Sequence, residues 1–309
     1  MQTTPIGFVD ADLLDGGTRF PNLALMKIAR YHRMQGDEVE FNIPNPDKVY
    51  ASVIFKRNRH KVDGLRLFYP DADINIGGSG YDLSLSLPPE IESMSPDYSI
   101  YPECDRYYGF TTRGCIRKCP FCIVPIKEGR FHRLYDSGFD AIMNIVGRDA
   151  PDFRRIEFLD NNILADKEWF FELTDNIPRG WKVDFNQGLD VRLLDDEIAE
   201  RIAEMRPITC WKFAYDSMSY TKSVLDGIEI LRNANIDLRN KVLFYVYCDS
   251  DNQYEDAVQR CRTLKEYGTT AYVMLNMDAP QTKRMKALKR WTRPMIFWTI
   301  DIEQYGVKA

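Results

Sequence analysis

The sequence predicts an α/β fold in two parts, a small unit with a parallel sheet over residues 1–80 and a partial (β/α)6 barrel over residues 106–280. Short apolar strands alternate with amphipathic helical stretches in both parts, and this alternation is typical of parallel sheets. In the second part each strand runs into polar residues, such as Asp160 and Asp216, as in barrels that carry chemistry at the carboxyl ends of their strands. Residues 81–105, with two adjacent prolines and several serines, predict a linker between the parts.

The first part begins with a predicted strand over residues 6–10, and Pro21 opens the helix that follows it. Leu25 and Ile28 recur at helical spacing and predict the buried face of that helix, and Gly36 ends it. Further strands are predicted at residues 38–41, 48–56 and 73–78.

The second part contains six predicted strands with helical stretches between them. The helices are recognised by their apolar spacing, as in Ile198 and Ile202 after the capping residue Asp195. The chain ends in a predicted basic helix and tail, residues 281–309. The six strands are predicted at residues 107–112, 155–159, 182–186, 210–215, 242–247 and 270–276.

The composition is ordinary for a globular protein, with 44% hydrophobic and 28% charged residues among 309. A net charge of −5 gives no overall attraction to nucleic acid or to an anionic membrane. No run of eighteen apolar residues is present, and the N-terminus lacks the build of a signal peptide. Seven cysteines, three of them clustered, indicate metal chemistry in a reducing compartment rather than a disulfide framework. We therefore expect a cytoplasmic protein with no membrane partner.

A short loop carries Cys115, Cys119 and Cys122 at C-x3-C-x2-C spacing. Such a loop can direct three thiolates at one centre, and soft thiolates select iron–sulfur clusters, zinc or copper(I). Three thiolates leave one iron of a 4Fe–4S cluster open to a small molecule, whereas the common four-cysteine site leaves none open. The alternative is a structural zinc site completed by His132 or Cys104.

This spacing, with the aromatic Phe121 just before the third cysteine, resembles the cluster loop of radical S-adenosylmethionine enzymes. The resemblance covers roughly residues 100–280 and implies a radical-SAM barrel whose 4Fe–4S cluster binds S-adenosylmethionine (SAM) at its open iron. In that family the reduced cluster cleaves SAM to a 5′-deoxyadenosyl radical, which abstracts hydrogen from a substrate. The resemblance also implies a flavodoxin- or ferredoxin-like reductant as a partner, and it leaves the substrate unidentified.

Asp160, Asn161 and Asn162 follow the second strand of the barrel, where related enzymes place polar groups that meet the amino group of SAM. A carboxylate or amide oxygen there can accept hydrogen bonds from an ammonium group. Asp and Asn also favour turns, so a purely local turn is the alternative.

Four further residues are implied as cofactor contacts at the ends of the third and fourth strands. Gln187 and Arg192 resemble a loop of cobalamin-type radical enzymes, in which the arginine can hold the methionine carboxylate in a bidentate pair. A surface salt bridge is the alternative for Arg192. Asp216 and Ser217 resemble a Glu-Ser pair in relatives, although Asp216 is shorter by one methylene.

The order of strand, loop, helix and late glycine-rich turn in residues 1–80 is similar to the Rossmann-like cobalamin-binding domain that precedes many such enzymes. The sequence lacks the Asp-x-His-x-x-Gly motif that would supply a histidine to cobalt. The resemblance therefore implies either a degenerate domain or cobalamin bound without a protein ligand. With cobalamin, the implied reaction is methyl transfer to an unactivated carbon; without it, hydrogen abstraction followed by rearrangement or bond formation is left open.

The segment from Lys283 to Arg293 holds six basic residues, no acid and Trp291. It predicts either contact with a nucleic-acid backbone, with Trp291 stacked on a base, or the solvated face of a capping helix. Together with the cysteines this segment supports a rival function, a zinc-containing nucleic-acid-binding protein. The radical SAM enzyme is the function that the sequence favours.

Overall fold

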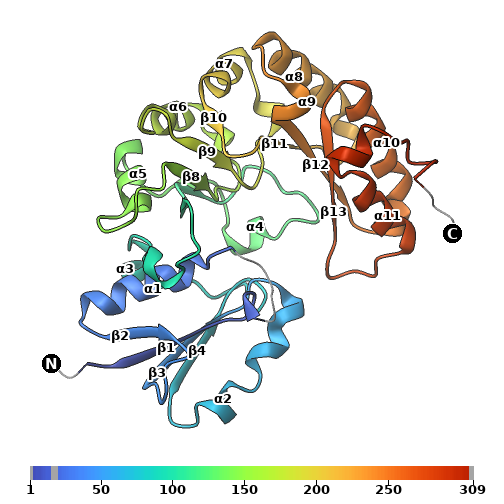
Figure 1. The fold of residues 1–309 in the computed structure, drawn as a ribbon. Helices are drawn as coiled ribbons and strands as arrows, with labels where there is room; N and C mark the ends of the chain where they lie inside the picture. The colour runs from blue at the N-terminus through green and yellow to red at the C-terminus, as the bar shows by residue number, and fades with distance from the viewer. Residues whose placement is uncertain (1–2, 15–19, 306–309) are drawn as a thin grey trace.

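The N-terminal part folds around a four-stranded sheet. The computed structural model describes residues 3–14 and 20–305, and within them the fold is mixed α/β with parallel sheets (Figure 1). This confirms the predicted α/β class. All neighbouring strands of the N-terminal sheet run parallel, in the order β2-β1-β3-β4. These strands are β1 (Pro5–Asp10), β2 (Glu38–Phe41), β3 (Lys48–Ser52) and β4 (Asp73–Gly77).

Helix α1 (Leu23–Met34) packs against this sheet, and its limits follow from the sequence. The Asn22 side chain accepts a hydrogen bond from the Leu25 amide (3.2 Å) and donates one to Ser52 Oγ (2.7 Å), so it both caps the helix and ties it to β3. Gly36, at φ +85°, lies just beyond the end of the helix, where the backbone turns left-handed. Leu25 and Ile28 are buried, as predicted.

The C-terminal part contains parallel strands in two neighbouring sheets, of order β10-β9-β8-β5 and β11-β12-β13. An isolated bridge between Leu189 and Phe213 joins the sheets, and Figure 1 shows their strands along an arc with helices on its outer side. All six predicted strands are present, and the two-residue strand β10 adds to them. The strands are β5 (Tyr107–Gly109), β8 (Arg155–Phe158), β9 (Lys182–Phe185), β10 (Arg206–Pro207), β11 (Trp211–Ala214), β12 (Val242–Cys248) and β13 (Thr270–Leu275).

The helices of this part lie between and after its strands. The longer ones are α5 (Gly138–Val146), α6 (Lys167–Asp175), α7 (Asp196–Glu204), α8 (Thr221–Asn233), α10 (Tyr254–Glu266) and α11 (Lys283–Trp291). Short elements complete the described fold: α2 (Leu65–Phe68), α3 (Pro89–Glu92), α4 (Val124–Lys127), α9 (Leu238–Lys241), α12 (Pro294–Phe297) and the antiparallel pair β6 (Thr112–Arg113) and β7 (His132–Arg133). None of the helices in the described ranges is both long and apolar enough to cross a membrane.

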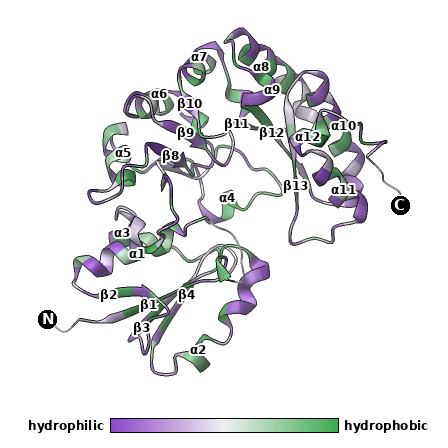
Figure 2. Ribbon diagram, in the orientation of Figure 1, coloured by the Kyte–Doolittle hydropathy of each residue, from purple (hydrophilic) through white to green (hydrophobic). Residues whose placement is uncertain are grey.

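The strands of the arc have two different faces. A Cβ at Gly109 would lie 2.3 Å from the Ile145 side chain of α5, so Gly109 faces the helices, as do its fully buried neighbour Phe158 and, farther along, Phe213. Figure 2 shows hydrophobic and hydrophilic residues mixed along these helices, whose apolar sides cover this face. We call the opposite face of the strands the inner face. Strand alternation and register assign to it Tyr108, Glu157, Asp184, Lys212, Tyr245, Tyr247, Tyr272 and Met274.

Residues 81–105 differ from the predicted surface linker. Ile91, Tyr98 and Tyr101 are buried in a hydrophobic core that draws on both parts of the chain. The Tyr101 hydroxyl also donates a hydrogen bond to Asp10 Oδ2 (2.7 Å) at the end of β1. The prolines and serines predicted exposure, but the aromatic side chains between them gain more free energy from burial than the segment loses by ordering.

Candidate functional site at the carboxyl ends of the strands

The cysteine loop, residues 114–122, follows β5 and the short strand β6. Gly114 begins it at φ +74°, and a Cβ there would lie 2.2 Å from the Arg130 carbonyl oxygen, so only glycine fits. The Cys115 amide then donates to the Gly129 carbonyl (3.4 Å), which holds the entry of the loop against the segment that leaves it. Helix α4, directly after the loop, lies on the open side of the arc in Figure 1.

The three thiols share one electrostatic neighbourhood. Burial raises the pKa of Cys119 and of Cys122, and the charge of Cys115 adds to both shifts. Within residues 3–14 and 20–305, no group of three His, Cys, Asp or Glu side chains is arranged as it stands to hold a metal ion. An iron–sulfur cluster distributes its thiolate ligands over several iron atoms. In type and number, the three thiols of this loop therefore fit such a cluster.

Asp190 links the cysteine loop to the polar residues around it, and the sequence did not predict this role. Its buried carboxylate accepts hydrogen bonds from Arg117 Nε (2.9 Å) and, in a bidentate pair, from Arg192 Nε and Nη2 (2.6 and 2.9 Å). Asn162 Nδ2 lies 3.4 Å from Asp190 Oδ2 and 3.6 Å from Cys115 Sγ. Burial opposes ionisation of Asp190, but the two arginines outweigh it and lower the pKa of this carboxyl. The surface salt bridge considered for Arg192 is thus a partly buried pair beside the thiols.

We expect Asp190→Ala to lower the free energy of unfolding by about 2–3 kcal/mol, less than the loss of a fully buried pair because both guanidiniums reach water. The side chains of Arg117 and Arg192 are 33% and 22% exposed, so each would be left half-buried without a carboxylate. Chemical denaturation measures the change. Asp175→Ala is the matched control, because Asp175 pairs with Arg201 at the surface and should contribute less than about 1 kcal/mol. Equal losses in the two variants would contradict this account.

The three polar residues after β8 take separate roles. Asp160 accepts hydrogen bonds from the amides and hydroxyls of Thr111 and Thr112 (2.6–3.2 Å), so its buried carboxylate holds the base of the cysteine loop. Burial raises the pKa of Asp160, although these hydrogen bonds oppose the shift. Asn161 Nδ2 and Asn162 Oδ1 are buried and have no hydrogen-bond partner among the described residues. Buried polar atoms in native proteins usually have a hydrogen-bond partner. The side-chain amides of Asn161 and Asn162 are therefore available to bind a ligand.

The residues predicted after β9 and β11 are only partly brought together. Asp216 accepts a hydrogen bond from the Tyr247 amide (3.1 Å), and burial raises its pKa. Its charge contributes to the pKa of both Cys119 and Cys122, so Asp216 lies near the thiols. Ser217 instead caps a helical turn by accepting from the Ser219 amide (3.2 Å). Gln187 is exposed in the turn after β9, and none of the hydrogen bonds found among the described residues joins it to the loop.

Phe121 joins the cysteine loop to the inner face. Its ring stacks on Tyr247 with centroids 4.4 Å apart and planes inclined by 28°. The Tyr247 hydroxyl donates to Asp249 Oδ1 (3.0 Å), and its backbone amide holds Asp216. The aromatic residue before the third cysteine therefore docks the loop onto β12.

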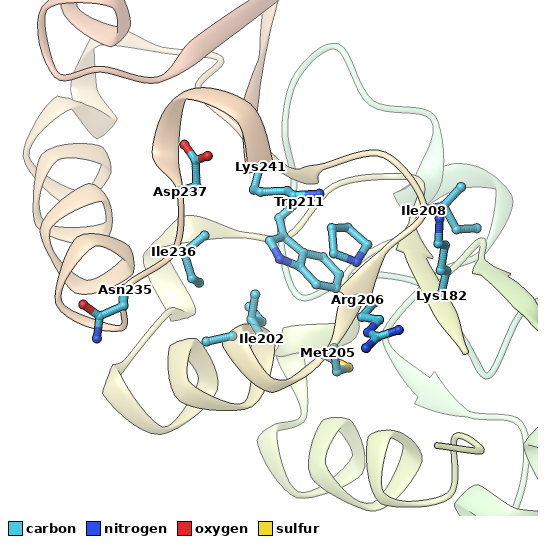
Figure 3. A pocket seen from close by; sticks show the side chains of 12 residues that line it. Lys182, Ile202, Met205, Arg206, Ile208, Trp211, Asn235, Ile236, Asp237 and Lys241 are labelled. Atoms are coloured by element: carbon cyan, nitrogen blue, oxygen red, sulfur yellow. The ribbon is translucent and has the colours of Figure 1, made fainter. Parts of the chain in front are cut away.

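A pocket of about 440 Å³ lies at the other end of the strands (Figure 3). Lys182 and Trp211, which begin β9 and β11, line it together with Lys241, which directly precedes β12. The cysteine loop lies at the carboxyl ends of these parallel strands. The pocket and the thiols are therefore at opposite ends of the strands.

The residues proposed for a zinc or nucleic-acid site lie in three separate places. His132 is exposed in β7, where it pairs with Arg113 beside the cysteine loop, and the Cys104 thiol donates to the Arg106 carbonyl (3.1 Å) before β5 begins. Trp291 is only 1% exposed and donates its Nε1–H to the Ile300 carbonyl (2.8 Å), so its ring packs inside the protein rather than standing free for a base. Its position on the apolar side of α11 buries it, while the basic residues take the other side.

Comparison with models of known protein families gives no match for this chain. A search of curated protein sequences finds no significant match either.

Proposed function

We propose that the protein is a radical SAM enzyme, which binds a 4Fe–4S cluster through Cys115, Cys119 and Cys122, cleaves SAM reductively and abstracts hydrogen from an unidentified substrate. The observation that carries the proposal is the three-thiol loop after β5, with an amide, a guanidinium and a carboxylate beside it. In this proposal the arc of strands is a partial (β/α)6 radical-SAM barrel, and the N-terminal part is a cobalamin-type Rossmann-like domain. A flavodoxin- or ferredoxin-like protein in the cytoplasm would supply electrons.

The cluster, when bound, would provide the electron that cleaves the sulfonium of SAM. The residues of the chain bind and orient SAM. Arg192 is fixed by two hydrogen bonds to Asp190 and by the Tyr220 ring, 4.3 Å from its guanidinium carbon, which leaves Nη1 to hold the methionine carboxylate. Asn162 Oδ1, which is buried with no partner in the described part of the chain, is suited to accept a hydrogen bond from the SAM ammonium. The Phe121–Tyr247 stack would keep water from one side of the loop.

Anaerobic purification and reconstitution test the proposal. We expect about four irons and four sulfides for each chain, and 5′-deoxyadenosine on addition of SAM and dithionite. Addition of cobalamin separates the reactions: retained cobalamin would favour methyl transfer, and its loss on gel filtration would favour cobalamin-free chemistry. A colourless protein with one zinc and no 5′-deoxyadenosine would overturn the proposal in favour of the zinc-binding alternative.

A further inference from the structure

Two acidic side chains lie next to one another on the inner face, away from the cysteine loop. Glu157 of β8 and Asp184 of β9 are partners in the parallel register, and they are only 1% and 3% exposed. One oxygen of each carboxyl has a cationic partner: Arg106 Nη1 donates to Glu157 Oε2 (3.1 Å), and Lys212 Nζ donates to Asp184 Oδ2. The other oxygens, Glu157 Oε1 and Asp184 Oδ1, are buried and have no hydrogen-bond partner within residues 3–14 and 20–305.

Two buried carboxylate oxygens without hydrogen-bond donors raise the free energy of the fold. A proton on one of the carboxyls, or a donor group on a ligand, would relieve this cost. Burial raises the pKa of Glu157 to about 7, and the charge of Asp184 is the next cause. Burial also raises the pKa of Asp184, against the opposing charge of Lys212. Near neutral pH, Glu157 therefore carries its proton in about half of the molecules, beside a second buried carboxyl whose pKa is also raised. The other titratable or charged groups in electrostatic reach of the pair are Cys104, Arg106, Tyr108, Cys210, Lys212 and Tyr245.

The inner face runs from this acid pair toward the cysteine loop. Tyr245 of β12 lies in electrostatic reach of both acids, and Tyr247, two residues further along the same face, stacks on Phe121 of the loop. The face is open where β13 forms its edge, because Tyr272 and Met274 are 41% and 43% exposed. A molecule bound on this aromatic face would lie between the thiols and the acid pair.

We propose that Glu157 and Asp184 are the proton-exchanging pair of the substrate site on the inner face, and that they take a substrate with a hydroxyl or amino group. This inference rests on the proposed function, because the proton transfer would serve the radical reaction proposed above. In the step itself, the substrate O–H or N–H bond breaks and its proton forms a new O–H bond on Glu157. The electron pair of the broken bond stays on the substrate, and Asp184 accepts a hydrogen bond from the new acid. The reverse transfer returns the proton to the product.

Infrared difference spectroscopy of the full chain between about pH 5.5 and about pH 9 tests the proton of the pair, because this range, roughly 1.5–2 units on either side of neutral, brackets the pKa of Glu157. We expect a carbonyl band of a protonated carboxyl that disappears with a midpoint of about 7. Glu157→Gln should remove the band, whereas Glu200→Gln, which changes an exposed glutamate on α7, should keep it. Absence of the band from the unmodified protein, or its persistence in Glu157→Gln, would overturn the proposal.

Two further readouts distinguish proton exchange from a structural role. Asp184→Asn should lower the midpoint, because it removes a neighbouring negative charge and leaves Lys212 beside Glu157. On rapid mixing with D2O the band should shift within seconds, since the inner face is open at β13; a band unchanged for hours would mean a sealed structural proton and would overturn the proposal. These spectra do not need the cluster. A normal band without 5′-deoxyadenosine would refute the proposed function alone, and 5′-deoxyadenosine without the band would refute this inference alone.

Discussion

Cys119→Ala is expected to leave the protein with little iron after reconstitution and to lower 5′-deoxyadenosine formation by at least about 100-fold, since even the loss of a residue that only supports a metal ligand costs ~10–100-fold. Cys119 lies in electrostatic reach of Cys115, Cys122 and Arg192, so its removal takes one of three donors from a single centre. Iron analysis and quantification of 5′-deoxyadenosine measure the effect.

Cys261→Ala is the control for this experiment. Cys261 is fully buried in α10, and burial raises the pKa of its thiol to about 12, as expected of a cysteine that serves only in packing. The control should keep its iron and its activity while losing some stability. Equal iron loss in the two variants would contradict the assignment of the cysteine loop, as would full activity of Cys119→Ala.

Arg260→Ala is expected to lower the free energy of unfolding by about 3–5 kcal/mol, through a cavity and through buried carbonyls left without donors. The Arg260 side chain is 2% exposed and donates to the carbonyls of Tyr215 (2.6 Å) and Tyr247 (2.9 Å). These carbonyls belong to the ends of β11 and β12, next to Asp216. In the proposed enzyme, the same variant should therefore also weaken SAM binding.

Two variants separate the contributions of Arg260. Arg260→Met keeps most of the volume and removes the hydrogen bonds, so its loss of stability should be smaller than that of Arg260→Ala. Arg290→Ala removes an exposed arginine from α11 and should change stability by less than about 0.5 kcal/mol. Thermal and urea denaturation would compare all three, and a similar small effect for Arg260→Ala and Arg290→Ala would refute the role assigned to Arg260.

The strands and the cysteine loop were predictable because their signals are local. Alternating apolar residues identify a strand such as β12 without knowledge of its neighbours, and the spacing of three cysteines is a property of a single loop. Asp160 was placed correctly at the end of β8, but its hydrogen bonds to Thr111 and Thr112 depend on residues 49 and 48 positions earlier in the chain. A local sequence pattern carries no information on such a partner.

The residues that the sequence did not reveal are charged side chains buried by distant contacts. Asp190 follows β9 as an ordinary helix-capping residue, and only the folded chain brings Arg117 to it across 73 residues. Glu157 and Asp184 look like the polar positions of alternating strands, which predicts exposure to solvent. They are buried because the strands curve around a shared inner face. Arg260 similarly resembles a solvated helix position until its two carbonyl partners are known.

Glu92 of α3 has a consequence for how the two parts of the chain fold. It accepts hydrogen bonds from Lys27 of α1 (3.1 Å) and from Arg113 of β6 (2.7 Å), directly before Gly114 and the first cysteine. The hydrophobic core is also continuous, from Ile6 in β1 to Ile302 near the end of the described chain. Loss of structure in the N-terminal part would therefore release the entry of the cysteine loop. We expect the two parts to unfold together, in one cooperative transition. The reactivity of the thiols toward alkylating reagents would then report on the folding of a sheet that contains none of them.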